Sequence, residues 1–137
     1  MVNDVLDGVT RALTAAFPES AVYADERVRQ GLQTPSFFVG LGEYTTAPLP
    51  AGRKRVRQQI EVTYFPKQQG NYGELWNVGE AALACLSEIT LPDGGMLRGT
   101  NLRCFMNDGM MHIHAVYNMR LRPVENGVFM GDIRIQT

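Results

Sequence analysis

Apolar residues recur at helical spacing in two stretches of the chain. The first covers about residues 3 to 17, with Asn3 placed to cap its start and Pro18 placed to end it. The second follows Asn71-Tyr-Gly-Glu74, which has the form of a capping box with Asn in place of the usual Ser or Thr, and it ends near Thr90. The pattern therefore predicts two amphipathic helices.

Alternation of apolar and polar residues marks the strands, because successive side chains of a strand point to opposite faces. The clearest example is Arg53–Phe65, which Pro66 closes. One of its faces is apolar apart from a single glutamine, and the other is strongly basic at its start. The apolar face holds Val56, Gln58, Ile60, Val62 and Tyr64. The polar face holds Arg53, Arg55, Arg57, Gln59, Glu61 and Thr63.

The last third of the chain alternates in the same way and predicts a meander of strands. Met96–Met106 and Met110–Arg122 are joined by Asn107-Asp-Gly109, a hairpin-turn sequence. A proline-rich loop is expected at Thr46–Gly52. The remaining predicted strands are short and cover about residues 21–24, 36–41 and 129–136.

These elements follow the order α-β-β-β-α-β-β-β and predict an α+β fold. We expect one domain spanning residues 1–137, in which two helices cover one face of a mixed, mostly antiparallel sheet. The sequence contains no linker, internal repeat or low-complexity tract that would divide it. The other sheet face is unusually polar, so in a closed assembly it could line a lumen or contact a neighbouring subunit.

Composition places the chain among soluble globular domains. It has 137 residues, of which 45% are hydrophobic and 20% charged, and its net charge is −1. That charge argues against a generally basic nucleic-acid-binding protein. No apolar run is long enough for a membrane span, and the N-terminal residues lack the pattern of a signal peptide. Two cysteines are too few for a disulfide scaffold and fit a reducing cytoplasm.

Two pairs of residues are candidates for chemistry. His112 and His114 point the same way from one predicted strand and could share a metal ion, with Asp108 in the preceding turn as a third ligand if the hairpin folds over. The alternative is two ordinary histidines on a solvated or interfacial face. Cys85 and Cys104 lack the glycine-flanked turn expected around a nucleophile and are interpreted as small core residues.

The segment Arg53-Lys-Arg-Val-Arg57 is the strongest charge cluster. It can be a solvated strand face, a contact with an acidic protein surface, or a phosphate-binding patch. Nucleotide-binding glycine loops and the G-x-S-x-G and C-x-x-C motifs are missing from the sequence. We therefore expect no enzyme activity and no cofactor.

Several blocks of the sequence resemble the tail terminator proteins encoded by phages and prophages of Gram-positive bacteria. These proteins share a Tyr-x-Asp-x-x-x-Gln-Gly-Leu block, then Pro-x-Phe-Phe, then a strand that ends in Tyr-Phe-Pro. The blocks follow one another here in the same order, as does the predicted order of helices and strands. The matching residues are Tyr23, Asp25, Gln30, Gly31, Leu32, Pro35, Phe37, Phe38, Tyr64, Phe65 and Pro66.

The resemblance implies a structural protein that forms a hexameric ring. Such a ring caps the tail tube, stops its growth and joins it to the head connector. The implied partners are other copies of the chain, the tail tube protein and the head–tail connector protein, with no membrane and no sequence-specific nucleic acid. The implied location is the host cytoplasm during assembly and then the virion tail.

We expect the contacts to come from the Thr45–Gly52 loop, from the strand start Arg53–Arg57 and from aromatic residues nearby. Three alternatives stay open: another head–tail joining or tail protein, a small metal-binding or ligand-binding domain that uses His112 and His114, and nucleic-acid binding through Arg53–Arg57. The expected contact residues are Arg53, Arg55, Arg57, Tyr44, Leu49 and Phe38.

Overall fold

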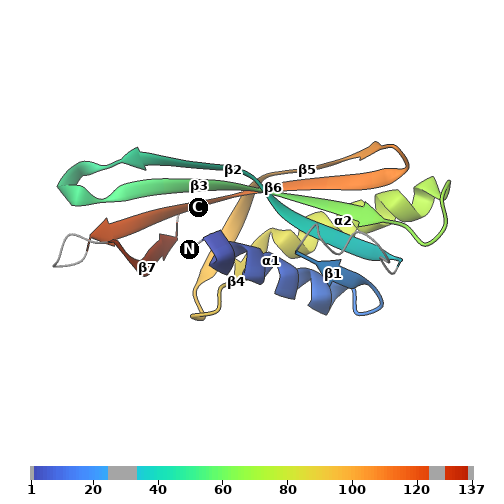
Figure 1. Ribbon diagram of the computed structural model, residues 1–137, viewed down its shortest axis with the longest axis horizontal. Helices are drawn as coiled ribbons and strands as arrows, with labels where there is room; N and C mark the ends of the chain where they lie inside the picture. Colours follow the sequence, from blue (N-terminus) through green and yellow to red (C-terminus); the bar gives the residue numbers. More distant parts are fainter. Residues whose placement is uncertain (1, 25–33, 124–128, 136–137) are drawn as a thin grey trace.

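The computed structural model describes residues 2–24, 34–123 and 129–135, and it confirms the predicted α+β fold (Figure 1). Two helices lie on the same side of one sheet, and the long strands extend past them. The elements are α1 (Val2–Ala16), β1 (Ala21–Tyr23), β2 (Ser36–Pro48), a short 3-10 turn η2 (Pro50–Gly52), β3 (Lys54–Phe65), α2 (Tyr72–Leu86), β4 (Glu88–Thr90), β5 (Met96–Asn107), β6 (Met110–Pro123) and β7 (Phe129–Ile135).

The sheet is mixed and mostly antiparallel, as predicted. Its strand order is β1-β2-β3-β6-β5-β4, and β7 also pairs with β6. Among the described strands, β1 and β2 run parallel and the other neighbours are antiparallel. β3 and β6 form the centre, where Lys54 lies opposite Leu121 and Tyr64 lies opposite Met111 without a break in register. Because this register is unbroken, the apolar residues of β3 and β6 lie on the same face across the middle of the sheet.

Two boundaries differ from the sequence prediction. The second helix ends at Leu86, and residues 88–90 form the unpredicted strand β4, in which Ile89 is buried. Ile89 lies three residues after Leu86, so its spacing also fits a helix, and periodicity alone cannot separate the two structures. β2 continues to Pro48, through residues assigned to a loop, because it pairs with β3 along its whole length.

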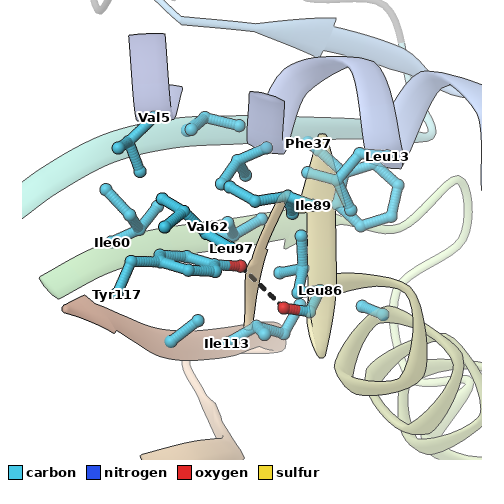
Figure 2. Packing of buried hydrophobic residues seen from close by; sticks show 14 of the residues in the cluster. Val5, Leu13, Phe37, Ile60, Val62, Leu86, Ile89, Leu97, Ile113 and Tyr117 are labelled. Carbon is cyan, nitrogen blue, oxygen red and sulfur yellow. Dashed lines mark hydrogen bonds between the residues drawn. The ribbon is translucent and has the colours of Figure 1, made fainter. Parts of the chain in front are cut away.

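The core lies between the helices and one face of the sheet (Figure 2). Val5, Val9 and Leu13 of α1 are fully buried against it. Phe37 of β2 packs between the rings of Phe17 and Tyr64, at centroid distances of 4.8 and 4.9 Å. The apolar faces predicted for the helices and for β3 and β6 are thus the buried ones, with the exception of Trp76 in α2, which is exposed.

Local signals in the sequence fix the helix start and one turn. The Asn71 side chain accepts a hydrogen bond from the Glu74 backbone N–H at 3.2 Å, which caps α2. The Glu74 carboxylate accepts from the Tyr64 hydroxyl at 3.0 Å and so ties the helix start to β3. Asp108 and Gly109 have φ values of 53° and 73°, as a two-residue type I′ turn between β5 and β6 requires.

The other end of α2 is fixed to the sheet by two hydrogen bonds. The buried Tyr117 hydroxyl of β6 donates to the Leu86 carbonyl at 2.7 Å (Figure 2), and the Gly99 N–H of β5 donates to the Ser87 carbonyl at 2.8 Å. A Cβ atom at Gly99 would lie 2.6 Å from the Leu86 oxygen, so only glycine permits this approach. The carbonyls of Leu86, the last residue of the helix, and of the following Ser87 thereby gain partners outside the helix.

Gln58 is a polar residue inside the apolar face of β3. Its side chain is fully buried, and neither amide atom has a hydrogen-bond partner among the described residues. A buried polar group without a partner costs folding free energy because it has lost its hydrogen bonds to water. The sequence pattern correctly predicted that Gln58 lies on the buried face. In the structure, its amide group makes no hydrogen bond with a described residue.

Replacement of Tyr117 by Phe tests the attachment of α2. Tyr117→Phe leaves the Leu86 carbonyl buried without its partner, so the free energy of unfolding should fall by about 1–3 kcal/mol, as measured by urea denaturation. Tyr44→Phe, at an exposed ring, is the matched control and should change it by less than about 0.5 kcal/mol. Equal stability of Tyr117→Phe and the original protein would show that the hydrogen bond contributes nothing.

Replacement of Gln58 by Met should change the free energy of unfolding in the opposite direction. Methionine has a similar shape and no unpaired amide, so Gln58→Met should raise the free energy of unfolding by about 1 kcal/mol or more. Gln59→Met, on the polar face, should bring no gain. The comparison requires only the two denaturation curves, and a loss of stability in Gln58→Met would mean that the amide does have a structural partner.

Candidate assembly surface

The hairpin of β2 and β3 projects past the helices (Figure 1). We call residues 41–59 the β2–β3 arm. All eight residues from Leu41 to Pro48 are exposed, whereas β3 alternates between buried and partly exposed positions. Strands in a folded domain usually bury at least one face. In the arm, both faces of the outer strand β2 are therefore exposed to solvent.

The tip of the arm is a compact turn. The Leu49 N–H donates to the Arg53 carbonyl at 2.8 Å, and Ala51 and Gly52 adopt positive φ values of 64° and 72°. The Arg53 Nε donates to the Pro50 carbonyl at 3.1 Å, so this guanidinium folds back onto the turn. The predicted Thr45–Gly52 loop is thus the end of a strand followed by a structured turn.

Five of the six expected contact residues lie on this arm. Arg57 pairs with Glu43 at 2.8 Å on the face opposite the helices, with 38% and 53% of the two side chains exposed. Tyr44 lies on the other face, opposite Gln58 in the register, and is also exposed. Leu49 is half-buried in the turn, while Arg53 folds back and Arg55 remains exposed.

Phe38 lies apart from the other expected contact residues. It is only 8% exposed, and its ring packs near the rings of Tyr23 and Phe65, each at a centroid distance of 6.3 Å. Its role in the monomer is therefore to hold the start of β2 against β1 and the end of β3.

The sheet face opposite the helices, which we call the polar face, carries a cluster around His114. The Nδ1 atom of His114 lies 3.2 Å from Nη2 of Arg103 and 3.3 Å from Nε2 of Gln59. Both neighbours can only donate, so Nδ1 accepts and the neutral ring carries its proton on Nε2. A hollow of about 410 Å³ opens here, lined by these three residues together with Arg57, Asn101, Leu102 and Val116.

The environment of His114 lowers its pKa. Partial burial is the main cause, and the positive charge of Arg103 and the neighbouring His112 act in the same direction, whereas Glu61 opposes them. Burial, Arg103 of β5 and His112 of β6 thus favour the neutral form of His114, and Glu61 of β3 favours the charged form less strongly.

His112 and His114 share one face, as predicted, but pack as aromatic rings. Phe105 stacks on His112 at 5.2 Å and meets His114 edge-on at 5.3 Å, while the Arg103 guanidinium lies 5.5 Å from the Phe105 ring centre. Among the described residues, no group of three or more His, Cys, Asp or Glu side chains is arranged to hold a metal ion. The two histidines therefore find no third ligand there, Asp108 included.

The two cysteines behave as core residues. Cys85 and Cys104 are free and pack against the hydrophobic core. Burial raises the pKa of Cys85 to about 11, and burial together with Glu80 raises the pKa of Cys104. Because a thiolate is the reactive form, both thiols are poor nucleophiles at neutral pH.

Sequence reasoning missed the Arg103–Phe105 part of the polar face. The strand holding both residues was predicted, and so was the Asn107-Asp-Gly109 turn that joins it to β6. A two-residue turn places Asn107 opposite Met110, and therefore Phe105 opposite His112 and Arg103 opposite His114, so the sequence held this signal although it was not used. Trp76 of α2, which its spacing placed among the apolar residues of the second helix, is 46% exposed, and Tyr72, four residues earlier, is 58% exposed.

The lowered pKa of His114 predicts a pH dependence of stability. The unfolded chain takes up a proton near the ordinary value of 6.5, whereas the folded protein takes it up only at lower pH. The unfolded state therefore binds more protons in this window, and the free energy of unfolding should fall as the pH drops below about 6.5.

His114→Gln, which keeps a hydrogen-bonding side chain but cannot titrate, should flatten this part of the profile. Denaturation curves between about pH 7.5 and pH 5 would show the slope, and a ring-proton NMR titration of His114 would give the pKa itself. A His114 pKa above 6.5 would contradict the prediction.

No helix in the described part of the chain is long and apolar enough to cross a membrane.

The chain is similar to one known family of proteins. A family model described as phage tail terminator protein matches residues 4–128. No curated protein gives a match. The family model covers most of the chain, including α1 from residue 4 onward, all of α2 and the arm, and it agrees with the resemblance seen in the sequence blocks. The chain therefore belongs to the phage tail terminator family, a family of structural phage tail proteins.

Proposed function

We propose that the protein forms a ring that ends the growing tail tube and joins it to the head connector. Membership in the tail terminator family supports a role among tail components. The arm is the surface of this chain that is best suited to contact a neighbouring subunit. Assembly would take place in the host cytoplasm, and the ring would then remain in the virion tail.

The observation that carries the proposal is the exposure of β2 on both faces. Leu41 and Tyr44 expose 39% and 37% of their surface, and Glu43 and Thr45 are exposed as well. Apolar surface gains free energy when a partner removes it from water. A neighbouring subunit that covers the arm would bury these side chains.

A ring follows if the arm of one copy contacts a different surface on the next. Such a heterologous contact repeats around an axis and closes when the rotation permits. The helices thicken only one side of the sheet, so the copies can approach one another more closely around the axis if the helices point outward. The polar face, with Arg57, Arg103 and His114, would then line the opening.

The first test is native mass by light scattering over a concentration series. One chain has a mass of 15.2 kDa, and a hexamer would appear as a discrete species of about six such masses. Tyr44→Ala should weaken this species, whereas Tyr72→Ala, at another exposed aromatic ring, should not. Adding the protein to polymerising tail tube protein should stop growth and shorten the tubes.

The main alternative is another tail or head–tail joining protein, which would behave differently in the same assay. A tube protein would polymerise into long stacks instead of stopping at one ring. A joining protein would bind the connector and leave tube length unchanged. A chain that stays monomeric and does not alter tube length would contradict the proposed function.

A further inference from the structure

The hollow on the polar face lies beside a bulge in β5. Thr100 lies opposite Val116, and Arg103 lies opposite His114. β5 therefore has one more residue than β6 in this interval, as is typical of a bulge. Asn101 lies inside the bulge with a positive φ of 50°. Asn101 and Arg103 thereby both line the hollow, which has a volume of about 410 Å³.

More hydrogen-bond donors meet at His114 than its ring can satisfy. Arg103 and Gln59 each direct an N–H group at the Nδ1 atom, at 3.2 and 3.3 Å. A neutral imidazole accepts through one nitrogen, which has a single lone pair in the plane of the ring. Two donors therefore compete for one acceptor, and one of them lacks a good partner in this arrangement.

The neighbouring carboxylates lie toward β2 and outside the hollow. Glu43 accepts a hydrogen bond from Arg57 at 2.8 Å. The Glu61 side chain lies over β2, where a Cβ atom at Gly42 would be 2.5 Å from its Oε2 atom. Within the described part of the chain, no carboxylate pairs with Arg103. The positive charge of Arg103 is therefore not neutralised by a described neighbour.

The side chains around the hollow suit an oxyanion. Two guanidinium groups, two amides and one imidazole line it, and none of its described lining residues has a carboxylate. These groups come from three strands, β3, β5 and β6. A carboxylate is planar and pairs best with a single guanidinium fork, whereas the oxygens of a phosphate point in several directions. Donors from three strands therefore favour a phosphate.

We propose that the hollow binds a phosphate group, to which Arg103 and Gln59 donate hydrogen bonds. The two donors then no longer compete, because each has its own acceptor. The phosphate is part of a nucleic-acid backbone or of a free phosphate compound, and its chemistry at this site is the same. The site lies within one copy of the chain, so it goes beyond the proposed ring and does not depend on it.

Phosphate binding is coupled to the protonation of His114. In the free protein, burial, Arg103 and His112 lower the pKa of this ring, and Glu61 raises it less strongly. A bound phosphate places a negative charge beside the ring and takes the hydrogen bond of Arg103 away from Nδ1. Both changes favour the protonated ring, so the pKa of His114 should rise when phosphate binds.

A ring-proton NMR titration tests the site. Inorganic phosphate is added to the full chain in exchange for chloride at constant ionic strength. The His114 signals should shift to saturation, and the pKa of His114 should be higher with phosphate than without it. Arg103→Gln should weaken phosphate binding at least about tenfold, because a charge-assisted hydrogen bond is lost. Gln59→Ala is a second substitution in the hollow and should also weaken binding.

Arg98→Gln is the matched control. Arg98 is an exposed residue of the same strand, and its replacement removes the same charge, but it does not line the hollow. This variant should bind phosphate within about twofold of the original protein, because exposed charges at a distance are screened. Thermal denaturation should show that all three variants fold. An equal loss in Arg98→Gln and Arg103→Gln, or no saturable response of His114, would overturn the proposal.

A DNA duplex and acetate identify the oxyanion. If the phosphate belongs to a nucleic acid, a duplex of about ten base pairs should bind, with an affinity that falls steeply with salt. Binding of inorganic phosphate without binding of the duplex would assign the hollow to a free phosphate compound. Acetate should bind at least about tenfold more weakly than phosphate. Equal binding of acetate would indicate a carboxylate of a partner protein and would contradict the proposal.

The titrations separate this inference from the proposed function. They follow one side chain in each copy and need no assembly. Phosphate binding by a chain that forms no ring would leave the site intact and contradict only the ring. A ring whose His114 signals do not respond to phosphate would contradict only the site.

Discussion

The uninterrupted pairing of β3 with β6 is the constraint on which the rest of the structure depends. It aligns two alternating strands so that their apolar residues face the helices together and their polar residues face away together. Tyr117 stands in the middle of this pairing and hydrogen-bonds to the last carbonyl of α2, which fixes the helix over the sheet. A one-residue slip would turn the apolar residues of one of the two strands to the solvent side, and if that strand were β6, the loss of Tyr117 from the core would release α2 as well.

The same pairing decides where the sheet remains open. With β3 and β6 in the centre, β2 and β5 become the outer long strands, and the short strands β1 and β4 cover only one end of each. The core closes on one side through α1, α2 and the buried face. The surfaces available for assembly are then the outer sides of β2 and β5, both faces of the arm and the polar face. The surface proposed for assembly is thus a consequence of the topology and not of a separate motif.

Sequence patterns predicted the parts of this structure that depend on near neighbours. Both helices, the cap at Asn71, the turn at Asp108-Gly109 and the faces of β3 and β6 follow from period, capping and turn chemistry. The extension of β2 to Pro48 could not be predicted, because a proline-containing segment becomes a strand only when β3 lies beside it. The contact of Arg103 with His114 follows from the same turn, which sets these residues opposite each other, whereas β3 and β6 are far apart in the sequence and periodicity carries no information about their register.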